Sequence, residues 1–173
     1  MSERCSERVT LSKAHTTATM VPCSSVFIYG TLMAPQVLKG LIGRVPDLVE
    51  PAILSNYRRH PVKEHVFPGI IPCSTGASTT KGLLLEGLSE NELKVLDWYE
   101  GEEYIRRDVK VKCDGISHET QCYVWSNPLS ELDLTQGWDY DTFRETKLDW
   151  YLATTVQPCR LELDDLGIGK YNS

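Results

Sequence analysis

A pair of acidic residues, Asp97 and Glu100, lies where a proton acceptor could be built. In the segment "LKVLDWYEG", Leu93, Leu96, Asp97 and Glu100 fall at positions i, i+3, i+4 and i+7, which share one face of a helix. A carboxyl group on a core-facing stripe loses hydration, and this raises its pKa. Glu100 also lies in the last helical turn, where the negative end of the helix dipole raises the pKa further. A carboxylate with a raised pKa is a good general base near neutral pH.

The pattern alone leaves two interpretations of Glu100 open. The residue directly precedes Gly101, a natural helix terminator, so its side chain could equally turn into solvent. Asp97 is predicted to be structural and to hold a backbone amide or an arginine side chain. The sequence therefore predicts one candidate base and one candidate structural acid on the same helix.

The loop that follows "VFIY" at residues 26–29 is the second candidate site. An apolar strand runs into Gly30, and "PQVLKGLIG" (35–43) reads as a short helix with proline in its first turn and glycine after its end. The backbone N–H groups of residues 30–33 could converge on a carboxylate or a phosphate, next to the positive end of that helix. No GK[ST] ending and no GxGxxG run follows, so a nucleotide is disfavoured. A plain strand-to-helix turn fits the same residues.

Histidine and arginine residues in "YRRHPVKEH" give weaker signals. Pro61 breaks the helical spacing between His60 and His65, so no metal site is expected there. Arg58 and Arg59 could each bind an acid. Because neighbouring residues on a strand point to opposite faces, at most one of the two arginines can enter a site.

The elements that must position these residues mix strands and helices. Extended segments are expected at 25–30, 48–62, 66–76 and 80–88, and the prolines at positions 51 and 61 indicate bends or sheet edges. Ser89 and Glu92 form a capping box that should start the helix containing Glu100. After that helix, the turn "DG" joins 104–113 to 117–125 in a predicted β-hairpin.

The C-terminal part of the chain contains an amphipathic pattern. Residues 139–156 are predicted to form a helix that buries Phe143, Leu148 and Tyr151, and residues 161–173 are predicted to be loop or frayed tail. The expected organisation is one α+β domain at 25–158, a disordered N-terminal tail at 1–24 and a C-terminal tail at 159–173.

Composition excludes several classes of function. The chain has 173 residues and a net charge of −6, and it lacks the basic stripe that a nucleic-acid-binding protein needs. No apolar run approaches the ~20 residues of a membrane span, and the polar first 25 residues do not resemble a secretory signal. The six cysteines show no CxxC spacing, so they are predicted to be reduced thiols in a cytoplasmic protein.

Several segments together resemble the γ-glutamyl cyclotransferase-like superfamily. They are "VFIYGTL", "GIIP", "KGLLLEGLSENELKVLDWYEGEEYIRRDVKV" and "CYVW", which occur in the right order over about residues 25–155. The branch that they resemble is that of the plant avirulence-induced-gene-like proteins and their γ-glutamylamine cyclotransferase relatives. The resemblance implies a small mixed β-barrel flanked by helices, with the site at one mouth of the barrel.

The resemblance also implies roles for particular residues. The glutamate of the EG pair is the general base of this family, which corresponds to Glu100, and Tyr104 corresponds to an aromatic residue near the same pocket. The family's YGxL loop cradles the α-carboxylate of a γ-glutamyl substrate through backbone amides. That loop corresponds to Tyr29, Gly30, Thr31 and Leu32, and it continues through Met33 and Ala34.

The implied reaction is an intramolecular cyclisation to 5-oxoproline that needs no metal or cofactor, because positioning provides most of the rate acceleration. The leaving group stays open. A non-catalytic small-carboxylate-binding or stress-signalling protein on the same fold is the alternative hypothesis, and protein partners are not predicted.

Overall fold

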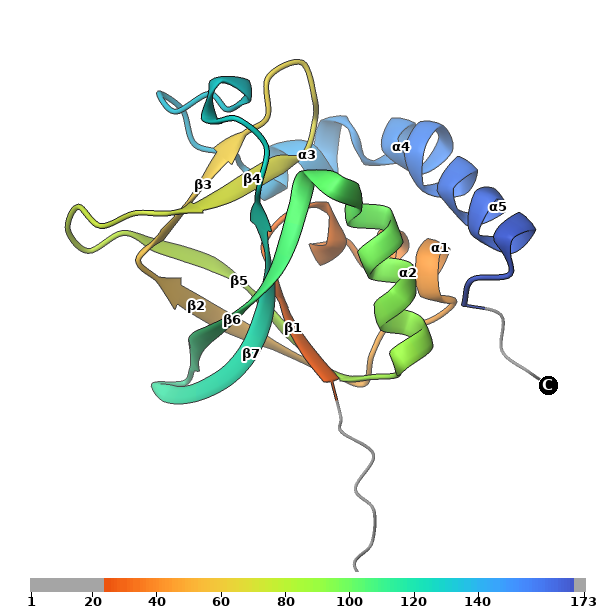
Figure 1. The fold of residues 1–173 in the computed structure, drawn as a ribbon, viewed down its shortest axis with the longest axis horizontal. Coiled ribbons are helices and arrows are strands. Elements are labelled where there is room, and N and C mark those ends of the chain that lie inside the picture. Colours follow the sequence, from red (N-terminus) through yellow and green to blue (C-terminus); the bar gives the residue numbers. More distant parts are fainter. Residues whose placement is uncertain (1–23, 170–173) are drawn as a thin grey trace, which may run out of the picture.

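Five strands close into a barrel in the computed structural model, which describes residues 24–169 (Figure 1). Their order around the barrel is β1 (Ser24–Ile28), β5 (Thr79–Leu88), β2 (Leu48–Ser55), β6 (Tyr104–Cys113) and β7 (Ile116–Trp125). All neighbours are antiparallel except β1 and β7, whose parallel pairing closes the barrel. The predicted α+β class and the predicted barrel are confirmed.

Two short strands form a separate sheet beside the barrel. These are β3 (Tyr57–Pro61) and β4 (Pro68–Pro72), which pair antiparallel. The proline-rich segment 48–62 is extended as predicted. Pro51 lies where β2 pairs with β5 alone, since β2 meets β6 only at Ile53 and Leu54. A sheet tolerates proline at such an unpaired edge because no partner requires its missing N–H.

The helices gather on one side of the barrel (Figure 1). They are α1 (Pro35–Ile42), α2 (Glu90–Glu100), α3 (Tyr140–Thr146), α4 (Leu148–Tyr151) and α5 (Gln157–Leu166), with short 3₁₀ turns at Thr31–Met33, Gly101–Glu103 and Leu129–Glu131. Gly43 ends α1 in the left-handed conformation, with φ of 79°. No helix within residues 24–169 is long and apolar enough to cross a membrane.

Two groups of buried side chains make up most of the core. One group fills the barrel interior and includes Phe27, Tyr29, Leu84 and Cys122. The larger group joins the outer face of β1 and β5 to the helices, and its members include Leu38, Leu96, Phe143 and Tyr151. Strand β1 therefore contributes to both groups, because successive side chains on a strand point to opposite faces.

The C-terminal region differs from its prediction. The expected continuous helix at 139–156 breaks at Lys147, and a π-helical turn occupies Leu152–Val156. The prediction of a loop or tail is wrong for residues 161–166, because α5 extends to Leu166 and its Leu163 is fully buried. The predicted burial of Phe143, Leu148 and Tyr151 is confirmed. The predicted disordered tail lies outside the described residues except for Ser24, which belongs to β1.

The capping box of α2 is reinforced by an ion pair. The Glu92 side chain accepts a hydrogen bond from the Ser89 N–H at 2.9 Å and pairs with both Nε and Nη2 of Arg44, at 2.5 and 2.8 Å. Glu92 is 3% exposed, so the pair is largely screened from water on the carboxylate side. Helix α2 is thus fastened at the end opposite to Glu100.

We expect Glu92→Gln to lower the free energy of unfolding by about 1.5–3 kcal/mol, because the variant weakens two charged hydrogen bonds from Arg44 and removes a buried negative charge beside that guanidinium. Chemical denaturation would measure the change. The matched control is Glu90→Gln in the same helical turn, where the side chain is exposed. Equal midpoints for the two variants would contradict the structural role assigned to Glu92.

Candidate functional site

A cavity of about 320 Å³ opens where the end of β1, the end of α2 and the C-terminal helices meet. It is lined by Phe27, Ile28, Tyr29, Gly30, Thr31, Leu32, His65, Phe67, Pro68, Tyr99, Glu100, Glu103, Tyr104, Tyr123, Tyr151 and Thr155. Seven of these sixteen residues are phenylalanine or tyrosine, and the two carboxylic acids, Glu100 and Glu103, come from the end of α2 and the 3₁₀ turn that follows. This is the typical composition of a small-molecule site, an apolar cleft with a few polar groups.

Glu100 is the last residue of α2 and faces the cavity, so its side chain does not turn away into solvent. Loss of hydration is the main cause, and together with the nearby charges of Glu103 and Asp97 it raises the pKa of Glu100 to about 8. Among residues 24–169, no hydrogen bond or ion pair engages the Glu100 carboxylate. Glu100 is therefore a free carboxyl group that takes up or releases a proton near neutral pH.

The loop Tyr29–Leu32, called the YGTL loop below, forms the opposite wall of the cavity. Within the described part of the chain, the N–H groups of Gly30, Thr31 and Leu32 donate no hydrogen bond to a backbone carbonyl. Successive backbone N–H groups without a partner are donors of the kind that bind anions. Of the six residues predicted for this loop, Met33 and Ala34 do not line the cavity, and Ala34 is fully buried in the core.

Glycine at position 30 allows Pro68 to pack closely on the backbone of the YGTL loop. Its φ is −123°, which is not a left-handed conformation, so no positive φ explains the glycine. A Cβ at this position would lie 3.0 Å from Cγ and 3.1 Å from Cδ of Pro68. Strand β4, which begins at Pro68, thus packs directly on the backbone of the YGTL loop.

Tyrosine hydroxyl groups connect the walls of the cavity. The Tyr99 hydroxyl is hydrogen-bonded to Thr31 Oγ1 at 2.8 Å and also to the Tyr151 hydroxyl. The Tyr104 hydroxyl donates to the Pro68 carbonyl at 2.7 Å. Burial raises the pKa of Tyr99, of Tyr104 and of Tyr151, the last to about 12, so all three phenols stay neutral near pH 7.

Asp97 does not line the cavity but binds side chains beside it. It forms an ion pair with Arg106, with Nε and Oδ1 3.3 Å apart, and it accepts a hydrogen bond from the Tyr123 hydroxyl at 2.7 Å. The prediction that Asp97 is structural and holds an arginine is confirmed. Tyr123 in turn accepts at its carbonyl a hydrogen bond of 2.6 Å from the Tyr29 hydroxyl.

The structure also shows which of the two neighbouring arginines, Arg58 or Arg59, points toward the site. Arg59 points toward the YGTL loop and donates from Nη1 to the Tyr29 carbonyl at 2.5 Å, whereas Arg58 is exposed. His60 is buried, with Nδ1 3.3 Å from the Gln136 carbonyl, and His65 stacks on Phe67. Residues 24–169 contain no group of three or more histidine, cysteine, aspartate or glutamate side chains that could hold a metal ion.

Sequence reasoning did not assign Tyr99, Glu103, Tyr123 or Tyr151 to the site. Tyr99 and Glu103 flank Glu100 along the chain, and this adjacency was the available signal. Tyr123 and Tyr151 belong to β7 and α4, and nothing local in the sequence indicates that they reach the end of α2. Tyr151 was predicted as a buried core residue, which it also is.

Comparison with known proteins identifies the family of this chain. The sequence pattern of the family described as "Gamma-glutamyl cyclotransferase, AIG2-like" matches residues 26–142. AIG2-like protein C of Arabidopsis thaliana is 39% identical over 132 residues, which cover 75% of this chain and 74% of that protein. AIG2-like protein D of the same plant is 35% identical over 140 residues, covering 79% and 90% of the two chains.

Solved structures show the same fold. A solution structure of an Arabidopsis thaliana protein superposes with a TM-score of 0.58 at 25% identity, over 80% of this chain and 91% of that one. A structure titled "Gamma-glutamyl cyclotransferase" superposes with a TM-score of 0.54 at 13% identity, over 87% and 90% of the two chains, and supports the fold alone. From its sequence match, its barrel and its relatives, this chain belongs to the AIG2-like gamma-glutamyl cyclotransferase family.

Proposed function

We propose that this protein is a γ-glutamyl cyclotransferase that releases 5-oxoproline from a γ-glutamyl amine or peptide, with Glu100 as the general base. The observation that carries the proposal is the placement of an unpaired carboxyl group of raised pKa and three unpaired backbone amides in one cavity. An α-amino acid head group presents an ammonium and a carboxylate on one carbon, which matches this pair of features.

The substrate would bind with its α-carboxylate on the N–H groups of the YGTL loop and its α-ammonium at Glu100. The ammonium favours the charged form of the carboxyl group, so binding lowers the pKa of Glu100 and generates the base. The aromatic walls exclude water and hold the γ-glutamyl chain in a folded conformation. Positioning the amine near the γ-carbonyl removes most of the entropic cost of ring closure.

The reaction follows from these positions. Glu100 accepts a proton from the α-ammonium, and the resulting amine attacks the γ-carbonyl carbon to form a five-membered ring. The γ-amide bond then breaks, and the protonated Glu100 donates its proton to the departing nitrogen. The carboxylate so formed takes the second proton from the ring nitrogen, which becomes the lactam N–H, and releases that proton to solvent. The products are 5-oxoproline and a free amine, and the carboxylate is regenerated. General acid–base transfer of this kind contributes about 10²–10⁴-fold to a rate.

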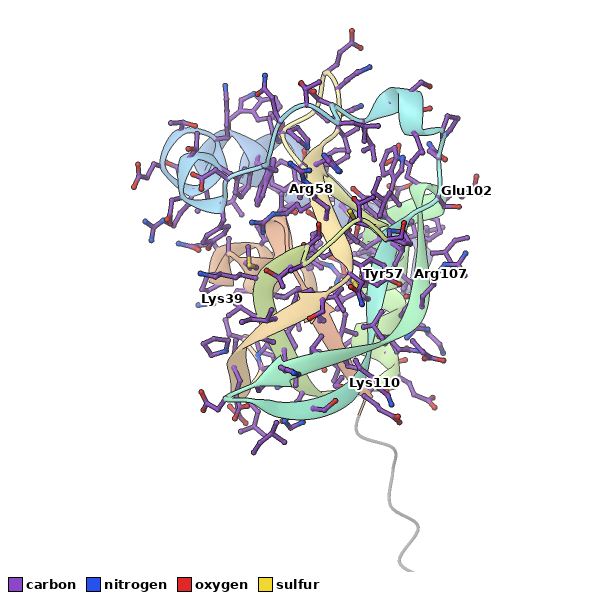
Figure 2. All side chains as sticks on the ribbon, turned by 90° about the vertical axis from the view of Figure 1, so that its left-hand side faces the viewer. Lys39, Tyr57, Arg58, Glu102, Arg107 and Lys110 are labelled. Atoms are coloured by element: carbon purple, nitrogen blue, oxygen red, sulfur yellow. The ribbon has the colours of Figure 1, made fainter. Side chains whose placement is uncertain are left out.

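The test is release of 5-oxoproline from a panel of γ-glutamylamines, γ-glutamyl dipeptides and glutathione. We expect product from at least one member with the wild-type protein, and loss of that product with Glu100→Gln. The matched control is Glu102→Gln, a substitution two residues away at an exposed side chain that does not line the cavity (Figure 2).

Absence of product from the whole panel would overturn the proposal. If 5-oxoproline or glutamate still raised the melting temperature in that case, the protein would be a carboxylate-binding member of the family without catalysis. The cytoplasmic location and any part in stress responses stay predictions, since they rest on the sequence alone.

A further inference from the structure

We propose that Arg59 is a positioning residue that holds and polarises the peptide group between Tyr29 and Gly30, and thereby strengthens the N–H that binds the substrate carboxylate. This inference rests on the proposed function for its kinetic consequence, but its structural part can be measured without any substrate.

The contact on which the proposal depends joins two distant segments. Arg59 lies on β3, and its Nη1 donates to the Tyr29 carbonyl oxygen at 2.5 Å, with the Lys81 carbonyl 3.5 Å from the same atom. The Tyr29 carbonyl and the Gly30 N–H belong to one planar, conjugated peptide group. A cationic donor at the oxygen draws electron density from the nitrogen, so the N–H becomes a stronger donor. The Gly30 N–H is one of the three unpaired amides at the cavity.

The guanidinium of Arg59 is itself fixed in place. Its Cζ lies 5.3 Å from the ring centroid of Trp138, within the range of a cation–π contact. The Trp138 indole donates to the Val66 carbonyl at 2.8 Å. The negative charge of Asp139 favours the charged form of Arg59. Burial lowers the pKa of Arg59, but an arginine side chain remains charged near neutral pH. A side chain held on several sides keeps one geometry, as positioning requires.

The charge of the cavity explains why such a residue is useful. Its lining contains two carboxylic acids, Glu100 and Glu103, and no lysine or arginine. An anionic substrate group entering this cavity meets repulsion from these acids. Arg59 does not line the cavity, so its positive charge at the Tyr29 carbonyl can offset part of that repulsion without occupying space that the substrate needs.

The same strand supplies a matched control. Arg58 precedes Arg59 on the strand and its side chain, labelled in Figure 2, is exposed to solvent. Within residues 24–169 no hydrogen bond or ion pair joins Arg58 to the YGTL loop. Arg58→Met and Arg59→Met therefore remove the same charge and the same donors from adjacent positions, and only the second removes the bond to the Tyr29 carbonyl.

The structural arm of the experiment uses the full-length protein without ligand. We expect Arg59→Met to shift the ¹⁵N and ¹H resonances of the Gly30 amide upfield, Arg59→Lys to restore part of the shift, and Arg58→Met to leave both resonances in place. Unchanged Gly30 resonances in a folded Arg59→Met protein would overturn the proposal. Because no substrate is involved, this result stands even if the panel of γ-glutamyl compounds yields no product.

The kinetic arm uses whichever γ-glutamyl substrate the wild type turns over, together with the analogue whose α-carboxylate is an α-carboxamide. A lost charged hydrogen bond corresponds to about a 10- to 100-fold loss of affinity. We expect Arg59→Met to raise KM for the acid by about that factor with little change in kcat, and to leave KM for the carboxamide nearly unchanged. Equal losses for acid and carboxamide would indicate a merely structural role and overturn the proposal.

Discussion

Glu100→Gln is expected to lower kcat by about 10²–10⁴-fold while it stabilises the fold at alkaline pH. Glutamine keeps the shape of the side chain but can neither take the proton of the α-ammonium nor return it to the leaving nitrogen. Because the cavity and the YGTL loop stay intact, substrate binding should weaken far less than turnover falls. Steady-state kinetics at saturating substrate would measure the loss.

The effect on stability follows from the raised pKa of Glu100. An unfolded glutamate titrates near 4.3, whereas in the folded protein the pKa of Glu100 is about 8. Between these values the folded state binds more protons than the unfolded state, so the contribution of this group to stability is fully present below the unfolded pKa. It is lost as the pH rises through the folded pKa. Glutamine carries no charge at any pH and escapes this loss.

We therefore expect the melting temperature of Glu100→Gln to exceed that of the wild type increasingly between pH 5 and pH 9. The free energy of unfolding of the variant at pH 9 should exceed that of the wild type by on the order of 1–3 kcal/mol. The difference is smaller than the full pKa shift implies because the cavity gives the carboxylate some access to water. Glu102→Gln, at an exposed position, should show no such divergence. Parallel stability curves for wild type and Glu100→Gln across this range would contradict the raised pKa.

If the wild-type protein catalyses the proposed reaction, its pH dependence should reflect the same pKa. The base must be ionised in the free protein, so kcat/KM is expected to rise with pH and level off above about 8. The bound ammonium lowers the pKa of Glu100, so kcat should rise with pH in the same way but at lower pH values than kcat/KM. Measuring kcat/KM and kcat against pH for one substrate would give the pKa of Glu100 in the free protein and in the complex separately.

Gly82→Ala is expected to be the most destabilising single methyl addition in the barrel. Gly82 lies on β5, and a Cβ there would stand 2.2 Å from the Ile28 carbonyl oxygen and 2.7 Å from Cζ of Phe27. The nearest atom belongs to the backbone of Ile28, the last residue of β1 that pairs with β5, so it cannot move without disturbing that pairing. We expect a loss of about 3 kcal/mol or more, at the upper end of overpacking effects.

Chemical denaturation of Gly82→Ala would measure this loss, and Gly137→Ala is the matched control. Gly137 has no positive φ and no atom within 4 Å of an added Cβ, so the same change should alter stability little. A loss below about 1 kcal/mol for Gly82→Ala would mean that β1 and β5 can separate, against the packing described above.

Local signals in the sequence were sufficient for most of the elements. The capping box at Ser89 and Glu92, the turn at Asp114–Gly115 and the strand before Gly30 were all predicted correctly, because each depends on residues close together in the chain. The place of Glu100 at the end of α2 was predicted for the same reason. Its helical phase and its place in the last turn are both local properties.

Contacts between distant segments could not be predicted in this way. The Tyr99–Tyr151 contact spans 52 positions and the Arg59–Tyr29 contact spans 30, and each depends on how whole elements pack. The break at Lys147 and the π-helical turn were not predicted either. Val156, in that turn, packs closely on α1, since a Cβ on Gly40 would lie 2.7 Å from its Cγ1.

The parallel closure of the barrel also has a consequence for the order of folding. Ser25 donates to Thr120, 95 positions away, and the Tyr29 hydroxyl reaches the Tyr123 carbonyl over 94 positions. During synthesis β1 leaves the ribosome long before β7 exists, so the YGTL loop has no fixed position until the hairpin β6–β7 has formed. The site is therefore completed only when nearly the whole domain has been translated, and bound ligand would mark chains whose barrel has closed.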